Sequence, residues 1–371
     1  MILRRIVPLT AILMLAATAA AGQVMQTQDA RVRAVAVAGG LENPWGMAFL
    51  PDGRILVTER PGRMRVVDKG QVSPPLGNVP KVFDSGQGGL LDVTLDPDFA
   101  RNRLLYFTYA EPGDGGAGTA LASAVFGETA LSDVKVLFRQ QPKVSGGLHF
   151  GSRVVVGADG KLWLGLGERY RRDEAQNLGT HLGKVIRIEK DGRVPSDNPF
   201  LGRSDARPEI WSYGHRNIQG MTRHPQTGVV WLHEHGPQGG DEINIPERGR
   251  NYGWPVITHG IDYSGAKIGI GAAAPGMEQP LLHWTPSIAP AGMAFYSGNR
   301  IPAWRGNLFV GSLKFGSLHR VVLAGTRVVR QEQMLKDIGD NIRDVRDAPD
   351  GFLYLATDSP RGRILRIEPA D

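Results

Sequence analysis

The amino-acid sequence predicts an all-β fold, a six-bladed β-propeller built from four-stranded antiparallel blades. Three observations lead to this prediction. A turn followed by a short apolar run recurs six times along the 371 residues, the chain holds 49 glycines, and no long segment shows the 3.6-residue apolar period of an amphipathic helix. Recurring units of this kind are typical of repeat architectures.

The recurring unit is clearest where an Asp-Gly pair precedes the apolar run. Residues 51–54 lead into 55–58, and residues 158–161 lead into 162–165. An Asp-Gly pair suits a hairpin turn because both central residues can adopt positive φ. Further copies of the unit place the other four strands, in chain order, at 103–107, 229–232, 308–311 and 352–356.

The spacing of these runs favours a propeller over other all-β folds. Their starts lie about 45 to 79 residues apart, whereas a four-stranded blade needs roughly 40 to 50 residues, so each unit can supply a blade and its loops. Two stacked β-sandwich domains are the alternative, but no Pro/Ser-rich linker divides the chain. We expect one propeller domain over 34–371, after a short N-terminal segment, 22–33. Three segments with alternating Arg and apolar residues should be half-exposed outer strands: 63–67, 184–188 and 363–367.

The first 21 residues, 1–21, have the pattern of a secretory signal peptide. Arg4 and Arg5 precede an apolar stretch, 6–17, that is too short to span a bilayer, and small residues follow it. We therefore expect a periplasmic or secreted protein without membrane insertion. Loss of the two arginines lowers the formal net charge from +6 to +4, and because no Lys/Arg run remains, no nucleic-acid partner is expected. The chain has no cysteine, so packing, topology or metal ions must stabilise it.

Long insertions between the predicted strands should lie together on one face of a propeller. They hold most of the His, Trp and acidic residues of interest, and they span 141–153, 168–183, 205–227, 233–263 and 278–292. We therefore expect the functional site on that face.

One of these insertions, 233–244, combines glycines that permit sharp bends with many oxygen-bearing side chains. Such a loop can direct carbonyl oxygens at a hard cation such as calcium. His233 and His235 could instead bind a transition metal. A solvated hairpin is the third possibility.

Other segments carry side chains suited to catalysis or to anion binding. His149 lies among glycines, and Glu168 at the end of the next strand could orient it as a general base, although a structural histidine in a turn is equally consistent with the sequence. Arg216 beside Asn217 offers a donor fork and an amide for a carboxylate or quinone oxygen, or else a surface ion pair. Two further cations would ordinarily be surface residues: Lys314 and Arg343.

Taken together and in this order, these segments resemble the soluble pyrroloquinoline-quinone-dependent sugar dehydrogenases, and most closely their aldose sugar dehydrogenase branch. The resemblance extends from about residue 41 to 368. Each motif is weak by itself, but seven occur in register: 41–46 (LENPWG), 86–92 (GQGGLLD), 146–151 (GGLHFG), 214–217 (GHRN), 236–244 (GPQGGDEIN), 251–255 (NYGWP) and 311–314 (GSLK).

The resemblance implies a six-bladed propeller with pyrroloquinoline quinone and calcium at one end of the central channel. It implies that His149 is the general base with Glu168 as its partner, and that Arg216 and Asp241 belong to the active site. The cofactor contacts it implies are Gln87, Arg216, Asn217, Lys314 and Arg343. The calcium ligands it implies are the carbonyls of Gly236 and Pro237, and, for a second calcium, the carbonyls of Glu242 and Tyr252 with the carboxylates of Asp262 and Glu278.

The reaction implied by the resemblance is oxidation of the C1 hydroxyl of an aldose to a lactone, with electrons passed to an external acceptor. The chain departs from the family at Asn341, where an arginine is common, and this should weaken the hold on the cofactor. Two other functions remain open: a calcium-dependent propeller lactonase or esterase, and a non-catalytic binding propeller. We expect a monomer or a homodimer.

Overall fold

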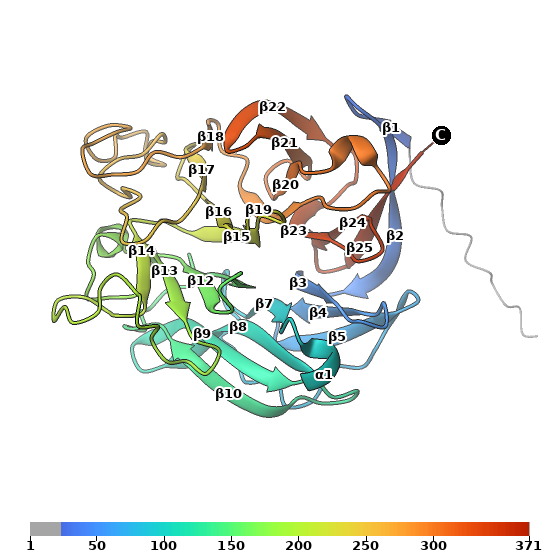
Figure 1. The fold of residues 1–371 in the computed structure, drawn as a ribbon, viewed down its shortest axis with the longest axis horizontal. Helices are drawn as coiled ribbons and strands as arrows, with labels where there is room; N and C mark the ends of the chain where they lie inside the picture. The colour runs from blue at the N-terminus through green and yellow to red at the C-terminus, as the bar shows by residue number, and fades with distance from the viewer. Residues whose placement is uncertain (1–23, 371) are drawn as a thin grey trace, which may run out of the picture.

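The computed structural model describes residues 24–370, which form six antiparallel sheets around a central axis (Figure 1). Their strands are β3 (Pro44–Phe49), β4 (Ile55–Glu59), β5 (Arg63–Asp68) and β6 (Gln71–Val72); β7 (Leu90–Leu95), β8 (Leu104–Gly113), β9 (Gly116–Val125) and β10 (Ser132–Arg139); β11 (Gly151–Val156), β12 (Leu162–Leu166), β13 (Lys184–Ile188) and β14 (Ile210–Tyr213); β15 (Ile218–Arg223), β16 (Val230–Glu234), β17 (Asp241–Asn244) and β18 (Leu282–Trp284); β19 (Pro290–Phe295), β20 (Leu308–Ser312), β21 (Leu318–Ala324) and β22 (Arg327–Met334); and β23 (Asn341–Asp347), β24 (Leu353–Asp358), β25 (Gly362–Pro369), β2 (Arg31–Leu41) and β1 (Val24–Gln26).

The sheets are the blades of a six-bladed β-propeller, which confirms the predicted fold class. The first strand of each blade lines the central axis, and these strands contact one another in succession until β23 meets β3 and closes the ring. Two stacked sandwiches would not form such a ring, so that alternative is wrong. The six recurring runs of the sequence are the second strands of the blades: β4, β8, β12, β16, β20 and β24.

The ring is closed by strands from both ends of the described chain. β2 pairs with β25, with Val32 opposite Pro369, and β1 adds a fifth strand outside β2. Residues 31–33, which the sequence assigned to a separate N-terminal segment, are therefore paired with the last blade. Figure 1 shows this junction where the blue and red strands meet. The predicted signal peptide, 1–21, lies outside the described residues.

The hydrophobic core lies between the blades rather than inside any one of them. Each of the six largest apolar clusters joins two neighbouring blades. Side chains alternate along β4, so Ile55 and Val57 pack toward the last blade whereas Leu56 packs toward the second. The strands expected to be half-exposed and outermost are in fact third in their blades, and β13 is buried throughout. The expected outermost position was therefore wrong, and so was half-exposure for β13, whereas buried and partly exposed residues largely alternate along β5 and β25.

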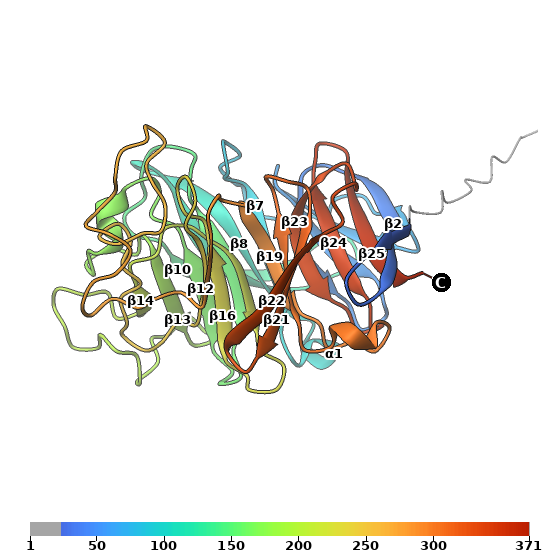
Figure 2. The same ribbon diagram turned by 90° about the horizontal axis from the view of Figure 1, so that it is seen from above.

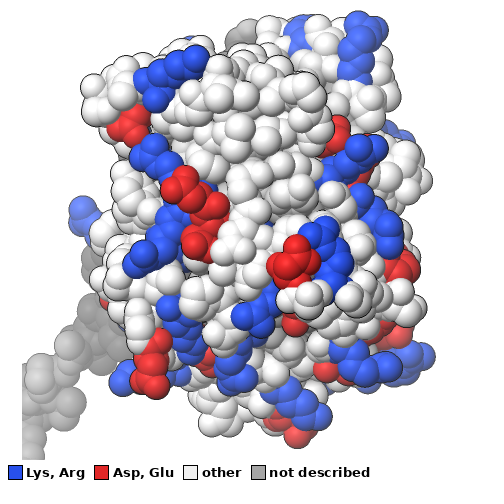
Figure 3. All heavy atoms as spheres, turned by 90° about the vertical axis from the view of Figure 1, so that its left-hand side faces the viewer, with Lys and Arg blue, Asp and Glu red and all other residues white. Residues whose placement is uncertain are grey.

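Helices are few and short in residues 24–370, and Figure 2 shows strands running between two faces that carry the loops. The helical segments are α1 (Phe99–Asn102) and the 3₁₀ turns η1 (Arg172–Ala175) and η2 (Pro302–Trp304). None of the described helices is long and apolar enough to cross a membrane. On the side of the molecule seen in Figure 3, acidic and basic side chains are interspersed.

Candidate active site

The predicted site residues gather on one face because of where they lie relative to the first two strands of each blade. These two strands are antiparallel, so the residues before the first and after the second lie at the same end of the blade. His149 and Arg216 precede β11 and β15, Glu168 follows β12, and Asp358 ends β24. The insertions that contain these residues therefore surround one end of the channel.

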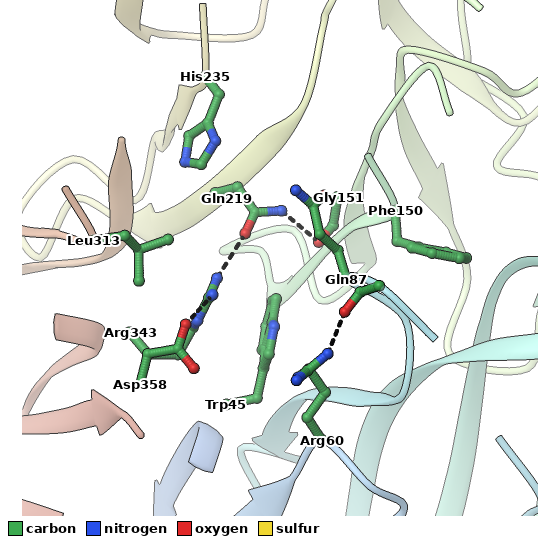
Figure 4. A pocket seen from close by; sticks show the side chains of 11 residues that line it. Trp45, Arg60, Gln87, Phe150, Gly151, Gln219, His235, Leu313, Arg343 and Asp358 are labelled. Atoms are coloured by element: carbon green, nitrogen blue, oxygen red, sulfur yellow. Dashed lines mark hydrogen bonds and ion pairs between the residues drawn. The ribbon is translucent and has the colours of Figure 1, made fainter. Parts of the chain in front are cut away.

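A cavity of about 240 Å³ lies at this end of the channel. Side chains from several blades converge around it, as Figure 4 shows. It is lined by Trp45, Arg60, Gly86, Gln87, Phe150, Gly151, Gln219, His235, Leu313, Arg343 and Asp358.

The structure brings His149 and Glu168 together. His149 Nδ1 lies 2.6 Å from Glu168 Oε2, and both side chains are buried. Burial lowers the pKa of His149, while the hydrogen bond and the charge of Glu168 oppose that shift. Glu168 Oε2 also accepts the backbone N–H of Tyr170 at 3.1 Å, which fixes the carboxylate. Because Nδ1 is engaged, Nε2 is the atom left to exchange a proton with a substrate.

The backbone at His149 is held in an uncommon conformation, with φ of 52°. A non-glycine residue in this left-handed region costs about 1–2 kcal/mol, so the surroundings must impose it. Gln87 Oε1 accepts the N–H of His149 at 2.8 Å, and Arg169 Nε donates to the carbonyl of Leu148 at 2.8 Å. A Cβ at Gly167 would collide with the His149 carbonyl oxygen, so glycine is needed there.

Arg216 is buried beside the His149 pair and is held from several directions. Its Nη1 donates to the carbonyls of His235 at 3.1 Å and Gly236 at 2.7 Å. Its backbone N–H donates to Glu234 Oε2 at 2.5 Å, and its guanidinium lies 5.2 Å from the ring centre of Trp254. These contacts fix a permanent positive charge close to the imidazole of His149.

Asn217, next to Arg216, is buried and faces the backbone of the neighbouring blade. Its Oδ1 accepts the N–H of Gly151 at 3.1 Å and the side-chain amide of Gln219 at 3.3 Å. Asn217 therefore ties two strands that border the cavity.

Asp241 is buried and its carboxylate is fully used by the protein. One oxygen accepts the N–H of Gly236 at 2.8 Å, and the other accepts Ser287 Oγ and the N–H of Ile288, each at 2.7 Å. Burial raises the pKa of Asp241, and these hydrogen bonds oppose the shift. The carboxylate thus joins the Gly236 loop to the segment before β19.

One wall of the cavity carries Arg343, whose guanidinium is paired with a carboxylate of the same wall. Arg343 donates to Gln219 Oε1 at 3.1 Å and to Asp358 Oδ2 at 2.5 Å. Burial favours the neutral form of Asp358, but the charge and hydrogen bond of Arg343, the hydrogen bond of Asn43 and the charge of Arg60 together lower the pKa of Asp358. Lys314 is exposed at the rim, directly after Leu313.

Two of the residues implied as ligands of a second calcium have their carboxylates paired with arginines. Asp262 pairs with Arg172 at 3.0 Å, and Glu278 pairs with Arg250 at 3.4 Å. In residues 24–370 no three His, Cys, Asp or Glu side chains form a cluster suited to a metal. Asp262 and Glu278 are thus engaged by arginines in this structure, and the calcium roles of Glu242, Tyr252, Asp262 and Glu278 stay a prediction. The transition-metal alternative would require His233 and His235 as ligands. In the structure, Nε2 of each ring is instead bonded to a backbone carbonyl, at 3.1 and 2.7 Å.

Several residues that line the cavity were not predicted from the sequence as site residues. Arg60 and Asp358 follow or end second strands, the position that brought Glu168 to the site, so the repeat itself could have identified them. Gln219 lies within β15, and only the cross-channel contact with Arg343 reveals its place. The sequence indicated His235 only as a possible metal ligand, yet this residue lines the cavity. Burial holds its pKa well below the ordinary value of histidine.

Comparisons with known proteins agree with the fold. The family model described as glucose/sorbosone dehydrogenase matches residues 41–366. The aldose sugar dehydrogenase YliI of Escherichia coli (strain K12) is 47% identical over 336 residues, covering 89% of this chain and 91% of that protein. The apo-form crystal structure of the soluble aldose sugar dehydrogenase from Escherichia coli has a TM-score of 0.89 at 45% identity, covering 91% of this chain and 100% of that one. The PQQ-bound aldose sugar dehydrogenase from Streptomyces coelicolor has a TM-score of 0.76 at 28% identity, covering 91% and 98%.

Proposed function

Because the chain belongs to the glucose/sorbosone dehydrogenase family, we propose that it oxidises the C1 hydroxyl of aldose sugars to lactones with pyrroloquinoline quinone and calcium as cofactors. The observation that carries this proposal is the buried His149–Glu168 pair beside a cavity lined by Arg343 and Arg60. The sugar would reduce the quinone, and an external electron acceptor would reoxidise it for the next turnover.

The cavity has the chemistry to hold a flat cofactor with three carboxylates. Arg343 and Arg60 line it and Lys314 stands at its rim, while Trp45 and Phe150 supply flat apolar surface. The Nε of Arg343 is buried without a hydrogen-bond partner among the described residues. Gln87 lines the same space, and Asn217 bonds to two residues that line it, Gly151 and Gln219; these complete the proposed contacts.

The carbonyls before and within the 236–244 loop suit a cation. Those of His235 and Gly236 already converge on the guanidinium of Arg216, and the Pro237 carbonyl follows directly. Backbone carbonyls are among the oxygen ligands that calcium takes, so those of Gly236 and Pro237 are the proposed ligands. Asp241 keeps this loop in place through the N–H of Gly236.

In the proposed reaction the protein moves one proton and places the sugar. His149 Nε2 takes the proton of the C1 hydroxyl, and Glu168 orients the ring and stabilises the imidazolium. When bound, the quinone with calcium would supply the carbonyl that accepts the C1 hydrogen with its electron pair. Arg216 donates toward negative charge that develops near it, at no reorganisation cost, because its position is already fixed.

The test is reconstitution of the cofactor-free protein with pyrroloquinoline quinone and calcium, followed by dye-linked oxidation of a panel of aldoses. Calcium-dependent hydrolysis of lactones or esters without the quinone would instead support the second candidate function. That function needs His149 to activate water but gives no reason for several cations to face one cavity.

The activity should depend on pH through His149, which must be neutral to accept a proton. Its pKa is lowered by burial, so kcat/KM should rise with pH and reach half of its plateau below about 6.5, the ordinary value of histidine. Glu168→Gln removes the charge that raises this pKa, so the midpoint should move still lower. A kcat/KM profile with an acid limb centred above 6.5 would contradict the assignment.

Asn341→Arg should tighten quinone binding. Asn341 is exposed at the start of β23, opposite Asp358, whose carboxylate already pairs with Arg343. A new guanidinium there can reach a cofactor carboxylate and contribute about 1–2 kcal/mol, or about five- to thirty-fold in affinity. The measurement is half-saturation of dye-linked activity by added quinone at fixed calcium. Equal or weaker half-saturation in the variant would show that this position does not face the cofactor.

We propose that the protein acts after export, in the periplasm or outside the cell, as the signal-like residues 1–21 indicate. It would work as a monomer or a homodimer, with a small aldose as substrate. The interspersed charges on the side seen in Figure 3 give no reason to propose a nucleic-acid partner.

A further inference from the structure

Three buried polar side chains form a hydrogen-bonded row directly beside Arg216. Ser212 Oγ lies 2.9 Å from His215 Nε2, and His215 Nδ1 lies 2.8 Å from Glu234 Oε1. Ser212 and His215 have no exposed surface, and Glu234 is 4% exposed. Serine, histidine and carboxylate stand in the order of a nucleophilic triad, but no substrate can reach a serine that is fully buried. The row must therefore act on the protein itself.

Glu234 is the member of this row that contacts the proposed reaction centre. Its Oε1 accepts the Nδ1–H of His215, because an ionised carboxylate can only accept hydrogen bonds, and its Oε2 accepts the backbone N–H of Arg216 at 2.5 Å. Asn244 is the next side-chain donor to Glu234 among the described residues, but 3.5 Å is longer than an effective N–H···O bond. His215 is thus the side chain that fixes the direction in which Glu234 meets Arg216.

The ring of His215 is itself held in one orientation. Tyr252 stacks on it, with ring centres 4.7 Å apart and an angle of 20° between the planes. The Tyr252 hydroxyl donates to the Ile245 carbonyl and accepts the N–H of Glu247 at 2.9 Å, so this second ring is fixed too. Because Ser212 engages Nε2, rotation of the imidazole would break two hydrogen bonds and one stacked contact.

The backbone that leads into Arg216 is braced by the insertion 168–183. The N–H of His215 donates to the Gly183 carbonyl at 3.2 Å, and the N–H of Gly214 donates to the Ala175 carbonyl at 3.0 Å. A Cβ at Gly183 would lie 2.3 Å from the His215 carbonyl oxygen, so glycine is needed where the two backbones meet. The segment before Arg216 is therefore anchored through its backbone on one side and through the His215 side chain on the other.

We propose that His215 is a positioning residue for the proposed oxidation. Through Glu234 it sets the place of the Arg216 backbone, and with it the place of the guanidinium that faces the negative charge developing in the reaction. Ser212 fixes the imidazole ring and takes no part as a nucleophile. This inference rests on the proposed function, which places Arg216 at the reaction centre, and it adds a residue that touches neither substrate nor cofactor.

The kinetic test uses two substitutions that differ in one hydrogen bond. His215→Leu removes both ring nitrogens, whereas His215→Asn can still donate to Glu234 from its side-chain amide. In single turnovers of the reconstituted enzyme, the rate constant of quinone reduction by glucose should fall about ten- to a hundred-fold in His215→Leu and less than about threefold in His215→Asn, since a misplacement of about 1 Å can cost about a hundred-fold. The KM for glucose should stay within about twofold, because the interaction with Arg216 strengthens only as charge develops. The single-turnover rate constant does not depend on how much of the protein is folded.

His319→Leu is the matched control. His319 is also buried, and its Nε2 lies 3.3 Å from Ser317 Oγ, but it lies on β21 in another blade. The substitution likewise removes a buried histidine that bonds to a serine, and it should leave the single-turnover rate constant within about twofold of wild type. A fall of equal size in His215→Asn or in His319→Leu would overturn the proposal, as would a His215→Leu rate constant within twofold of wild type.

Hydrogen exchange of the cofactor-free protein separates this inference from the proposed function. In peptides that contain Arg216, amide exchange should be about tenfold faster or more in His215→Leu than in wild type, and unchanged in His215→Asn and His319→Leu. Unchanged exchange in His215→Leu would overturn the positioning role even in an active enzyme. Faster exchange in a protein that oxidises no aldose would support the positioning role and refute the proposed reaction.

Glu234→Gln takes the place of His215→Leu in both measurements if the leucine variant does not fold. A glutamine amide has one accepting oxygen, so it cannot accept from His215 and from the backbone N–H of Arg216 together. The same losses are therefore expected, and a Glu234→Gln protein with the rate constant and the exchange of wild type would overturn the proposal.

Discussion

His149→Ala is expected to lower kcat for aldose oxidation by about 10²- to 10⁴-fold, the usual contribution of a positioned general base. The imidazole is the group that Glu168 orients at 2.6 Å. Arg216 cannot replace it, because a guanidinium stays protonated at the pH of any assay. Single-turnover reduction of the quinone by glucose, measured in reconstituted protein, reports this step directly.

The same variant should keep its cofactor. His149 directly precedes Phe150, which lines the cavity, but the cations proposed to hold the quinone, Arg343 and Lys314, are on other blades. Half-saturation by quinone should therefore change by less than about threefold. Glu168→Gln is the companion variant: it preserves the shape of the side chain, removes its charge, and should cause a smaller fall in kcat. A kcat for His149→Ala within threefold of wild type would exclude His149 as the base.

The fold was predictable from sequence because its repeat is local. A turn and the second strand of each blade are consecutive, so 51–58 or 158–165 can be identified without knowing what packs against them. Burial of the third strands was not predictable in this way. Arg187 on β13 has the alternating pattern of an exposed strand, yet it is buried by stacking on Trp211 and by pairing with Asp197.

Site residues were predictable from the sequence where a short motif within one insertion contains them. Contacts between side chains from opposite sides of the channel were not predictable. The glycines around His149 and the Arg-Asn pair at 216–217 are visible in the sequence as short motifs. The pairing of Asp262 with Arg172 joins residues 90 positions apart. The contact of Arg343 with Gln219 joins residues 124 positions apart. No local pattern specifies which partner such a charge will find.

Contacts across the channel also support the floor of the cavity, where two arginines and two aspartates form a buried network. Arg153 on β11 donates to Asp92 at 3.2 Å and to Asp344 at 2.8 Å. Arg346 on β23 bonds to the same two carboxylates, at 2.5 and 2.7 Å. The four charges balance, and together they tie three innermost strands: β7, β11 and β23.

Arg153 connects this network to the proposed cofactor site. Its Nη2 donates to the carbonyl of Arg343 at 2.9 Å and its Nε to the carbonyl of Gln219 at 2.8 Å. Its guanidinium also lies 4.1 Å from the ring centre of Trp45. The same side chain thus fixes three residues that line the cavity.

Arg153→Met should therefore lower the free energy of unfolding by about 3–5 kcal/mol, because it leaves two buried carboxylates with a single cation. Methionine has a similar length, so the loss reflects charge and hydrogen bonding more than a cavity. Urea denaturation of the cofactor-free protein measures the change, with Arg101→Met as control. Arg101 pairs with Asp98 at 2.9 Å, but their side chains are 81% and 58% exposed, so that variant should change stability by less than about 1 kcal/mol. Equal stability of the two variants would show that Arg346 alone neutralises both carboxylates.

If the network also places Arg343 and Trp45, half-saturation by quinone should rise in Arg153→Met and stay unchanged in Arg101→Met.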